Sequence, residues 1–299
     1  MTSFGNEPLF LGIDGGGSKC RAVLYRKDSG IIGEGLAGPA NPVQGLERAQ
    51  DAVLACASAA LSDAGLSQSQ LGHLIVGAGL AGVNAPRTRA AMLSWQHPFA
   101  QFYLTTDLHI ASLGAHDGTD GAVIITGTGS SGFSQCAGQQ RFLGGHGFPL
   151  GDKAGGAWLG LAAVQAALLA LDNLGPATSL SQAVLAKTHS QDSTALMDQF
   201  CGQPSAPYGQ LAALVFDEAA KGDAVAKAIV ADGAGYLSNM VLQLTELGPI
   251  KVAFIGGLGG IWQPWLSDAA KARITPALQG PEVGAVIYAQ QRYTGEHAP

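Results

Sequence analysis

Two glycine-rich turns, each lying between two short apolar segments, constrain the fold of this chain more than any other feature. The first, within residues 11–24, contains Gly15, Gly16, Gly17, Ser18 and Lys19. The second, within residues 122–133, contains Gly127, Thr128, Gly129 and Ser130. Glycines let backbone N–H groups approach a polyphosphate without a Cβ in the way. Two such turns in one chain therefore indicate a duplicated module that holds ATP from both sides.

Composition bounds the size and the partners of the protein. The chain has 299 residues, of which 47% are hydrophobic and 13% charged, which suffices for one large domain or two ordinary ones and argues against disorder. With a net charge of −6, the chain lacks the excess of basic residues that nucleic-acid binding usually needs. The longest apolar stretch, residues 157–171, contains Gln165 and is shorter than the roughly 20 residues of a membrane span. We therefore expect neither a nucleic-acid nor a membrane partner.

Cysteine usage favours a reducing compartment. The four cysteines are scattered, and no pair has the spacing of a metal site or a disulfide framework: Cys20, Cys56, Cys136 and Cys201. The N-terminus lacks the basic, apolar and small-residue segments of a secretory signal. These features predict a cytoplasmic protein.

The order of predicted elements shows one pattern twice. Strands are expected at residues 10–14, 20–26, 31–36, 71–76 and 102–106, with helices at 46–64, after Pro86 and from Asp107. The second half has expected strands at 121–126, 132–136, 141–143 and 251–255, and helices at 154–174, 180–189, 210–220, 223–247 and 282–292. Each half begins with a three-stranded antiparallel meander. The polar segment 116–120 marks the expected boundary between two α/β domains.

One motif favours a different class, a dinucleotide-binding enzyme. Residues 77–82 form a G-x-G-x-x-G string after a predicted strand, and Asp107 follows about 25 residues later. Pro86 argues against this interpretation, because it would fall inside the helix of that motif and remove a needed N–H. We expect Asn84 instead to cap a helix whose first turn contains Pro86. Residues 127–132 match the same string, but a predicted strand follows them, so no helix N-terminus is expected there.

Three segments resemble, in order, the first phosphate loop, the second phosphate loop and the adenosine loop of the actin/heat-shock-chaperone/sugar-kinase superfamily: residues 14–19, 126–130 and 255–259. Within it, the chain is similar to the N-acetylglucosamine kinase branch, which is grouped with the BadF/BadG/BcrA/BcrD ATPases. Further matching segments extend the resemblance over essentially the whole chain: residues 38–41, 79–82, 105–107 and 144–152.

The resemblance implies an α/β fold of two ribonuclease H-like (actin-like ATPase) domains. Each domain is expected to contain a mixed β-sheet, with a cleft between the two. The expected domains are residues 1–117 and residues 118–281. The C-terminal helix, residues 282–295, is expected to pack back on the first domain.

The resemblance also implies a role for each motif residue. Asp107 is implied as the catalytic base that accepts the proton of the attacking sugar hydroxyl. Asp14 is implied to hold Mg²⁺ through water. The implied phosphate contacts are Gly15, Gly16, Gly17, Ser18, Lys19, Gly127, Thr128, Gly129 and Ser130. The implied adenosine contacts are Gly256, Gly257 and Gly259, and the implied sugar contacts are Asn41, Asp107, Gly145 and Asp152.

Several of these residues also have a purely structural interpretation. Asp107 and Asp152 can cap the helices that follow them, and Asp14 can be a turn residue. Lys19 can be a solvated strand residue, and residues 256–259 can form an ordinary turn from strand to helix.

The chain departs from its relatives beside the implied sugar pocket. Relatives usually have G-G-W-G…G-D-E-G-S here, whereas this chain has His146 for the tryptophan, Lys153 for the glutamate, Ala154 for the glycine and Gly155 for the serine. Ala81 stands where some relatives have a serine. The exchange of a carboxylate for an ammonium at Lys153 changes the charge near the sugar. These departures bear on the identity of the sugar more than on the type of reaction.

The expected function is that of an ATP- and Mg²⁺-dependent kinase that phosphorylates a hydroxyl of N-acetylglucosamine or glucosamine. The resemblance also implies a homodimer. A first alternative is a non-catalytic protein that binds ATP and sugar on the same scaffold, and His146 and Lys153 are the residues that allow it. A second alternative is the dinucleotide-binding enzyme that would use residues 77–82.

Overall fold

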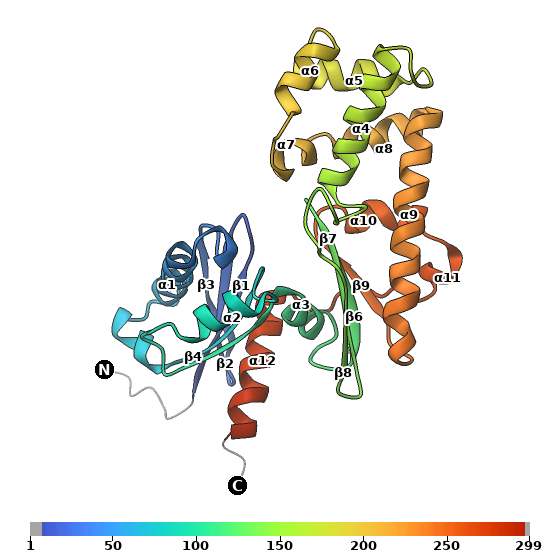
Figure 1. The fold of residues 1–299 in the computed structure, drawn as a ribbon. Coiled ribbons are helices and arrows are strands. Elements are labelled where there is room, and N and C mark those ends of the chain that lie inside the picture. Colours follow the sequence, from blue (N-terminus) through green and yellow to red (C-terminus); the bar gives the residue numbers. More distant parts are fainter. Residues whose placement is uncertain (1–7, 297–299) are drawn as a thin grey trace. The chain divides into compact units, whose positions relative to one another are not determined.

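The computed structural model describes residues 8–296, which form two compact units (Figure 1). Unit 1 comprises the described residues up to Gly121 together with those from Pro276 onward. Unit 2 comprises Ala122–Thr275. The chain therefore leaves unit 1 to form unit 2 and returns to unit 1 at its end.

Unit 1 contains a five-stranded mixed sheet. Its strands are β1 (Leu9–Gly15), β2 (Cys20–Arg26), β3 (Gly30–Ala37), β4 (Leu74–Leu80) and β5 (Gln101–Thr106), in the order β3-β2-β1-β4-β5. Its helices are α1 (Leu46–Asp63), α2 (Pro86–Leu93), α3 (Asp107–Ala115) and α12 (Pro281–Glu296), with 3₁₀ turns at Pro42–Gln44 and Gln68–His73. β1, β2 and β3 form an antiparallel meander, while β1, β4 and β5 are parallel. The predicted α/β class of this half is confirmed.

Strand β4 differs from its prediction, and the difference removes the dinucleotide motif. The predicted strand ended at residue 76, before the glycines, but β4 continues to Leu80 with Gly77 and Gly79 in its buried interior. The glycines are needed because other elements press on the strand. A Cβ on Gly77 would lie 2.1 Å from the carbonyl oxygen of Ala285 in α12. Residues 77–80 of the string therefore belong to a tightly packed strand and not to a phosphate-binding turn.

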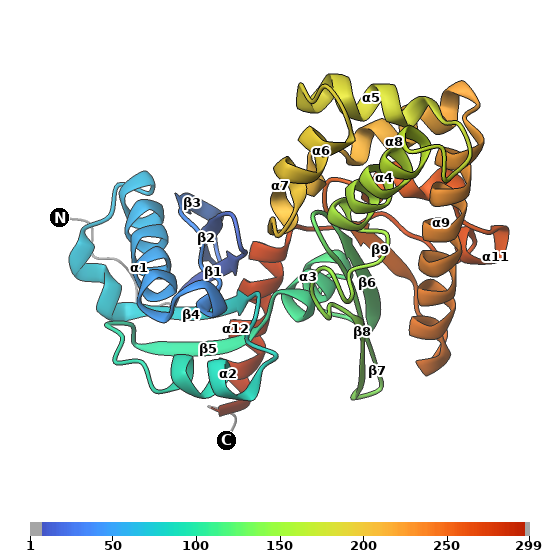
Figure 2. The same cartoon turned by 45° about the horizontal axis from the view of Figure 1, so that its top comes forward.

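The C-terminal helix α12 packs against one face of this sheet and against α3 (Figure 2). Its backbone approaches β1 so closely that a Cβ on Gly12 would lie 2.0 Å from the carbonyl oxygen of Glu282. It meets α3 in the same way, since a Cβ on Gly284 would lie 1.9 Å from the carbonyl oxygen of Ile110. These close approaches place the first turn of α12 beside the end of β1.

The opposite face of the sheet carries the main core of unit 1. Leu11 and Ile13 of β1 are fully buried there, together with Val53 and Leu61 of α1. Side chains alternate between the two faces of a strand. Asp14, which follows Ile13, therefore lies on the face that α12 covers.

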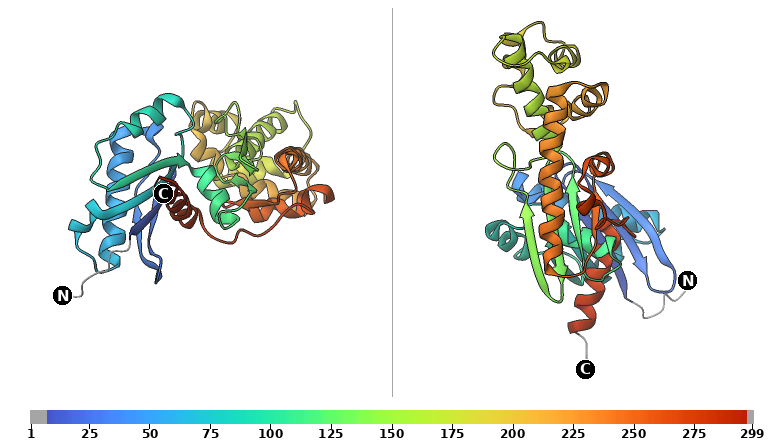
Figure 3. Two further views of the ribbon diagram at one scale, coloured as in Figure 1. Left: turned by 90° about the horizontal axis from the view of Figure 1, so that it is seen from below. Right: turned by 90° about the vertical axis from the view of Figure 1, so that its right-hand side faces the viewer.

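Unit 2 repeats the sheet order of unit 1. Its strands are β6 (Gly121–Thr126), β7 (Ser130–Cys136), β8 (Gln139–Gly144) and β9 (Val252–Ile255), in the order β8-β7-β6-β9. β7 and β8 are antiparallel and β9 is parallel to β6, so the four strands correspond to β3, β2, β1 and β4 of unit 1. The long helix α9 (Ala224–Leu244) runs along this sheet (Figure 3). The duplicated module predicted from the two glycine turns is confirmed.

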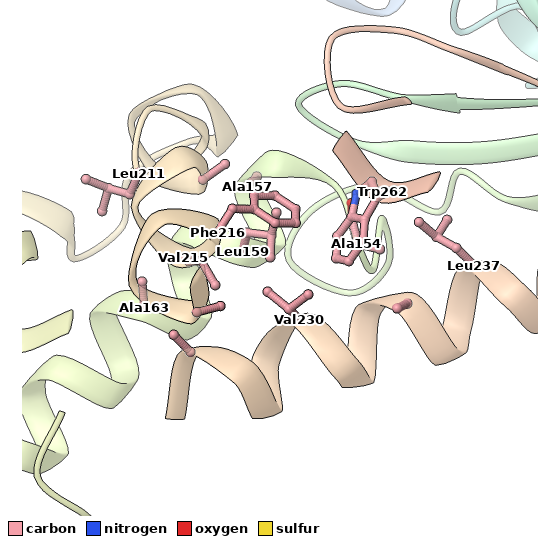
Figure 4. Packing of buried hydrophobic residues seen from close by; sticks show 14 of the residues in the cluster. Ala154, Ala157, Leu159, Ala163, Leu211, Val215, Phe216, Val230, Leu237 and Trp262 are labelled. Atoms are coloured by element: carbon pink, nitrogen blue, oxygen red, sulfur yellow. The ribbon is translucent and has the colours of Figure 1, made fainter. Parts of the chain in front are cut away.

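The rest of unit 2 is mainly helical. The helices are α4 (Gly156–Leu171), α5 (Ser179–Thr188), α6 (Ser193–Phe200), α7 (Ser205–Gly209), α8 (Ala212–Lys221), α10 (Gly259–Trp262) and α11 (Asp268–Lys271), with 3₁₀ turns at Thr245–Leu247 and Gln263–Trp265. Figure 4 shows their core, in which Trp262 is fully buried and contacts Phe216 edge to face. The Trp262 indole N–H donates to the carbonyl of Ala154 at 3.0 Å.

Two details of the helices differ from the predictions. Helices α6 and α7 were not predicted, because they are too short to show a clear helical period. The cap predicted at Asn84 is wrong, because Ala85 is the N-cap residue of α2 and makes no side-chain cap bond. In the described part of the chain, no helix combines the length and the apolar character needed to span a bilayer.

Candidate functional site

Two carboxylates lie at the carboxyl end of the parallel strands of unit 1. Asp14 is the penultimate residue of β1, and Asp107 follows β5 as the first residue of α3. The sheet register pairs Asp14 with Gly79 of β4, and Gly79 with Thr105 of β5. Both carboxylates therefore belong to the same edge of the sheet. In open α/β sheets, ligands bind beyond this edge.

Burial and mutual repulsion change the acidity of both carboxyls. Burial, followed by the charges of Asp107 and Glu282, raises the pKa of Asp14 from 3.8 to about 7, against the opposing charges of Lys19 and Arg21. Burial also raises the pKa of Asp107. Carboxyls in such surroundings are suited to hold a cation or to accept a proton near neutral pH.

Thr106, and not Asp107, caps the N-terminus of α3. Thr106 is the N-cap residue, and its hydroxyl accepts the N–H of His109 at 3.1 Å. The interpretation of Asp107 as the cap of α3 is therefore wrong. Oδ1 of Asp107 accepts the N–H of Leu108 at 2.9 Å, which orients the carboxylate.

The first glycine turn is anchored at its base and open at its tip. The N–H of Ala81 donates to the carbonyl of Gly15 at 2.8 Å, and the N–H of Ala40 to that of Gly16 at 3.0 Å. Gly17, Ser18 and Lys19 are exposed. None of these glycines has a positive φ. A Cβ on Gly15 would lie 2.4 Å from Cδ2 of Leu80, whereas the nearest atom to a Cβ on Gly16 would be 3.5 Å away.

Asn41 lies beside this turn in unit 1. Its Oδ1 accepts the N–H of Val43 at 2.9 Å, and a Cβ on Gly82 would lie 2.5 Å from the same oxygen. The hydrogen bond leaves the amide NH₂ of Asn41 to donate to a ligand. Unit 1 thus gathers the residues implied for the base, the metal, the first phosphate loop and one sugar contact.

The second glycine turn is held by the N-terminus of α4. The N–H groups of Gly156 and Ala157 donate to the carbonyls of Gly127 and Thr128 at 2.8 and 2.9 Å. The expectation that no helix N-terminus meets this turn is wrong, because α4 supplies one from further along the chain. The positive end of the α4 dipole therefore lies next to the turn, as an anion site favours.

Asp152 lies against the same turn. A Cβ on Gly129 would lie 2.3 Å from Oδ2 of Asp152, and Oδ1 accepts the N–H of Gly147 at 3.1 Å. Burial raises the pKa of Asp152, against this hydrogen bond and the charge of His146. The N-cap residue of α4 is Gly155, so the interpretation of Asp152 as that cap is wrong. With a φ of +60°, Asp152 adopts a left-handed conformation that is often retained at functional sites.

Ser130 and Lys153 are engaged within unit 2. The hydroxyl of Ser130 donates to the carbonyl of Lys153 at 2.5 Å. The ammonium of Lys153 pairs with Asp232 at 2.7 Å and lies 5.7 Å from the centre of the Trp158 ring. The positive charge that Lys153 introduces near the implied sugar pocket therefore has its own carboxylate partner.

The third motif lies beside the second glycine turn. β9 pairs Ile255 with Ile125 of β6, and the N–H of Leu258 donates to the carbonyl of Thr126 at 3.0 Å. Gly256 has a φ of +94°, and a Cβ there would lie 2.4 Å from that carbonyl oxygen. Unit 2 therefore brings the implied adenosine contacts Gly256, Gly257 and Gly259 next to the implied phosphate contacts.

A pocket of about 830 Å³ opens beside the second glycine turn and Asp152. The second glycine turn lines it with Thr128 and Gly129, Asp152 lines it from the following segment, and Gln203 and Ser205 line it from the segment around the start of α7. Gly145 lies in the same segment as Asp152, and its N–H donates to the carbonyl of Ser130 at 3.0 Å. No sequence motif marks Gln203 and Ser205, so neither could be predicted as a pocket residue. The volume suits a small-molecule ligand.

A metal ion at Asp14 fits only one kind of coordination. In the part of the chain that the structure describes, no three His, Cys, Asp or Glu side chains are placed to hold a metal together. Mg²⁺ commonly keeps several waters and binds through one or two carboxylates and a substrate phosphate. Asp14 can serve as such a single carboxylate, and the nearby carboxylates of Asp107 and Glu282 add negative charge around it.

Comparison with known proteins places this geometry in a family. The sequence profile of the BadF/BadG/BcrA/BcrD ATPase family matches residues 11–289. The chain is 33% identical over 281 residues to glucosamine kinase GspK of Vibrio cholerae serotype O1, covering 94% of this chain and 95% of that protein. It is 28% identical over 258 residues to N-acetyl-D-glucosamine kinase of Dictyostelium discoideum, covering 79% of each. A crystal structure from Chromobacterium violaceum, provisionally named an N-acetylglucosamine kinase, matches with a TM-score of 0.88 at 31% identity, over 95% of this chain and 99% of that one.

Proposed function

Because the chain belongs to the BadF/BadG/BcrA/BcrD ATPase family, we propose that it is an ATP-dependent kinase that phosphorylates an amino sugar. The relatives named above act on glucosamine or N-acetylglucosamine, and we propose one of these two as the acceptor. The structural observation that supports this most directly is the pair of carboxylates, Asp14 and Asp107, at the end of the parallel strands of unit 1.

Asp107 acts in this proposal as the general base. The N–H of Leu108 fixes one oxygen of the carboxylate, and Oδ2 accepts the proton of the sugar hydroxyl as that hydroxyl attacks the γ-phosphate. Burial raises the pKa of Asp107, which brings its basicity closer to neutral pH. Phosphoryl transfer asks the protein mainly for positioning and charge neutralisation, so one well-oriented carboxylate suffices.

Asp14 supports Mg²⁺ in this proposal, through water. A bound Mg²⁺ would neutralise charge on the phosphates during transfer. The turns at residues 15–19 and 127–130 would bind the phosphates, chiefly through backbone N–H groups. At Ser130 the contact would come from the backbone, since its hydroxyl is engaged with Lys153.

The remaining motif residues would bind the nucleoside and the sugar. Residues 256–259 would contact the adenosine. Asn41, Gly145 and Asp152 would contact sugar hydroxyls, and a sugar that lacks one of these hydroxyls would leave a polar group unpaired. The homodimer that the resemblance implies and the cytoplasmic location that the cysteine usage predicts stay predictions, which light scattering and cell fractionation test.

The two alternatives from the sequence have little structural support. The non-catalytic protein depended on His146 and Lys153, and the charge of Lys153 is paired with Asp232. The dinucleotide-binding enzyme depended on a turn at residues 77–82, but Gly77 and Gly79 lie inside β4.

A coupled ADP-release assay with Mg-ATP and a panel of hexoses and hexosamines tests the proposed function. We expect glucosamine or N-acetylglucosamine to raise ADP release at least about tenfold over the rate without sugar, and glucose to do so much less. If ATP binds and no sugar raises ADP release, the protein is a non-catalytic binder and the proposal fails.

A further inference from the structure

Arg21 lies directly opposite Asp14 and its charge lowers the pKa of Asp14, yet its guanidinium pairs with other carboxylates. The register of β1 and β2 pairs the two residues. Side chains of such a pair have Cβ atoms about 4.5–5.5 Å apart, and an arginine so close to a carboxylate commonly forms a bidentate pair with it. Here the guanidinium nitrogens lie 3.6 Å from a carboxylate oxygen of Glu282 and 3.6 Å from one of Glu34. Within residues 8–296, the ion pairs of Arg21 are with Glu282 and Glu34, and it forms none with Asp14.

Glu282 is the better-buried of the two partners of Arg21. Its side chain is 13% exposed, whereas that of Glu34 is 63% exposed. Solvent screens an exposed ion pair, which then contributes little to stability. The ion pair of Arg21 with Glu282 is therefore stronger than its ion pair with Glu34.

The position of Glu282 follows from the close packing of α12 on β1. Gly12 precedes Asp14 by two residues and lies on the same face of the strand. Its missing side chain lets the backbone of Glu282 approach, since a Cβ on Gly12 would lie 2.0 Å from the Glu282 carbonyl oxygen. Glu282 is the second residue of α12, where the helix dipole favours a carboxylate. The chain therefore brings a carboxylate from near its C-terminus to the end of its first strand.

We propose that Glu282 is a positioning residue for phosphoryl transfer: it holds Arg21 away from Asp14 and so keeps the Asp14 carboxylate available to the divalent cation of the nucleotide. Without Glu282, the guanidinium is free to swing across the strand pair and occupy Asp14. The inference rests on the proposed function, because it takes the cation to be that of a bound Mg-nucleotide.

A double-mutant cycle on the full chain tests this inference. The binding of Mg-ADP is measured by thermal shift, and that of Mn²⁺-ADP by electron paramagnetic resonance, for the wild type, Glu282→Gln, Arg21→Gln and the double variant. We expect Glu282→Gln to weaken binding at least about fivefold, because Arg21 then pairs with Asp14. The double variant should bind within about twofold of the wild type, because no guanidinium remains to compete. Binding of ADP without a divalent cation should change less than about twofold in every variant.

Glu34→Gln is the matched control. It removes a carboxylate at the same distance from Arg21 but leaves Glu282 in place, and we expect Mg-ADP affinity within about twofold of the wild type. If Glu282→Gln fails to fold, Arg21→Gln still tests the inference. This variant should bind Mg-ADP at least as tightly as the wild type.

Three results would overturn the inference. One is a Glu282→Gln protein that binds Mg-ADP as the wild type does. Another is a double variant as weak as Glu282→Gln, which would assign the loss to Glu282 itself. The third is a loss of affinity in Arg21→Gln. Each of these leaves the proposed function standing, whereas a wild type that binds no Mg-ADP would remove both.

Discussion

The carboxylate of Asp152 occupies the space that a side chain at Gly129 would need, since a Cβ there would lie 2.3 Å from its Oδ2. The contact joins a residue implied in sugar binding to the loop implied in phosphate binding, within unit 2. Oδ1 of the same carboxylate is held by the N–H of Gly147. Asp152 is therefore fixed from two sides, and one of them depends on the absence of a side chain.

Gly129→Ala should disturb sugar binding more than nucleotide binding. The added methyl group must displace the Asp152 carboxylate, so we expect the KM for the amino sugar to rise about tenfold or more. Gly127→Ala is the matched control, because a Cβ at Gly127 has no heavy atom within 4 Å. It should leave the sugar KM within about twofold of the wild type. Steady-state kinetics measure both, and equal sugar KM values in the two variants would contradict the account.

Asp107→Asn should remove catalysis and leave the fold intact. The amide cannot accept the proton of the sugar hydroxyl, so we expect kcat to fall by about 10²–10⁴. Thermal stability and Mg-ADP binding should persist. Asp28→Asn, at an exposed turn, is the control and should keep the wild-type kcat. A near-normal kcat in Asp107→Asn would show that another group takes the proton.

His97 should make unit 1 less stable in mild acid. Its Nδ1 is buried and has no hydrogen-bond partner in the described structure, and burial lowers the pKa of His97 below 6.5. As the pH falls below 6.5, the unfolded chain takes up a proton that the folded chain resists, so the free energy of unfolding decreases until the lower folded pKa is passed. Well above pH 6.5 the imidazole is neutral in both the folded and the unfolded chain, and the residue has no effect on stability.

His97→Phe should reduce this loss. A phenyl ring keeps the stacking of His97 on Phe99, whose ring centre lies 5.6 Å away, and carries no titrating group. We expect the drop in Tm between about pH 7.5 and 5.5 to shrink by about 1–3 °C. The exposed His73, changed to Gln, should leave the drop unaltered. An unchanged drop in His97→Phe would show that His97 is protonated in the folded protein as easily as in the unfolded one.

Gly284→Ala should loosen α12 from α3. The new Cβ would lie 1.9 Å from the carbonyl oxygen of Ile110, which is backbone and cannot move alone, so we expect a loss of about 1–3 kcal/mol in the free energy of unfolding. Gly295→Ala is the control in the same helix, because nothing lies within 4 Å of a Cβ there. It should be neutral or stabilise by up to about 1 kcal/mol. Urea denaturation measures both, and equal stabilities would contradict the close contact.

Local sequence was sufficient to predict the meander of each sheet, because each meander is built from neighbours in the chain. The apolar segments and glycine turns at residues 11–24 and 122–133 mark strand, turn and strand directly. The same local view failed at Gly77 and Gly79. A glycine that opens a turn and a glycine that lets a distant helix touch a strand are alike in sequence, and α12 lies about two hundred residues away.

The residues of the candidate site also fall into those that a local motif marks and those that only the fold brings together. Asp14 and Asp107 stand in short motifs and could be identified from them. Glu282 could not, because its neighbours Arg21 and Asp14 lie at the other end of the chain. The N-terminus of α4 at the second glycine turn was missed for the same reason, since the turn is followed in sequence by a strand and only in space by a helix.

The most direct test of the central claim is to identify the products of the reaction by mass spectrometry. The purified full-length protein is incubated with Mg-ATP and either glucosamine or N-acetylglucosamine. The account predicts one equivalent of sugar monophosphate for each equivalent of ADP, and neither product in excess of background with Asp107→Asn. ADP without sugar phosphate, or no turnover of either sugar by a protein that binds Mg-ATP, would contradict it.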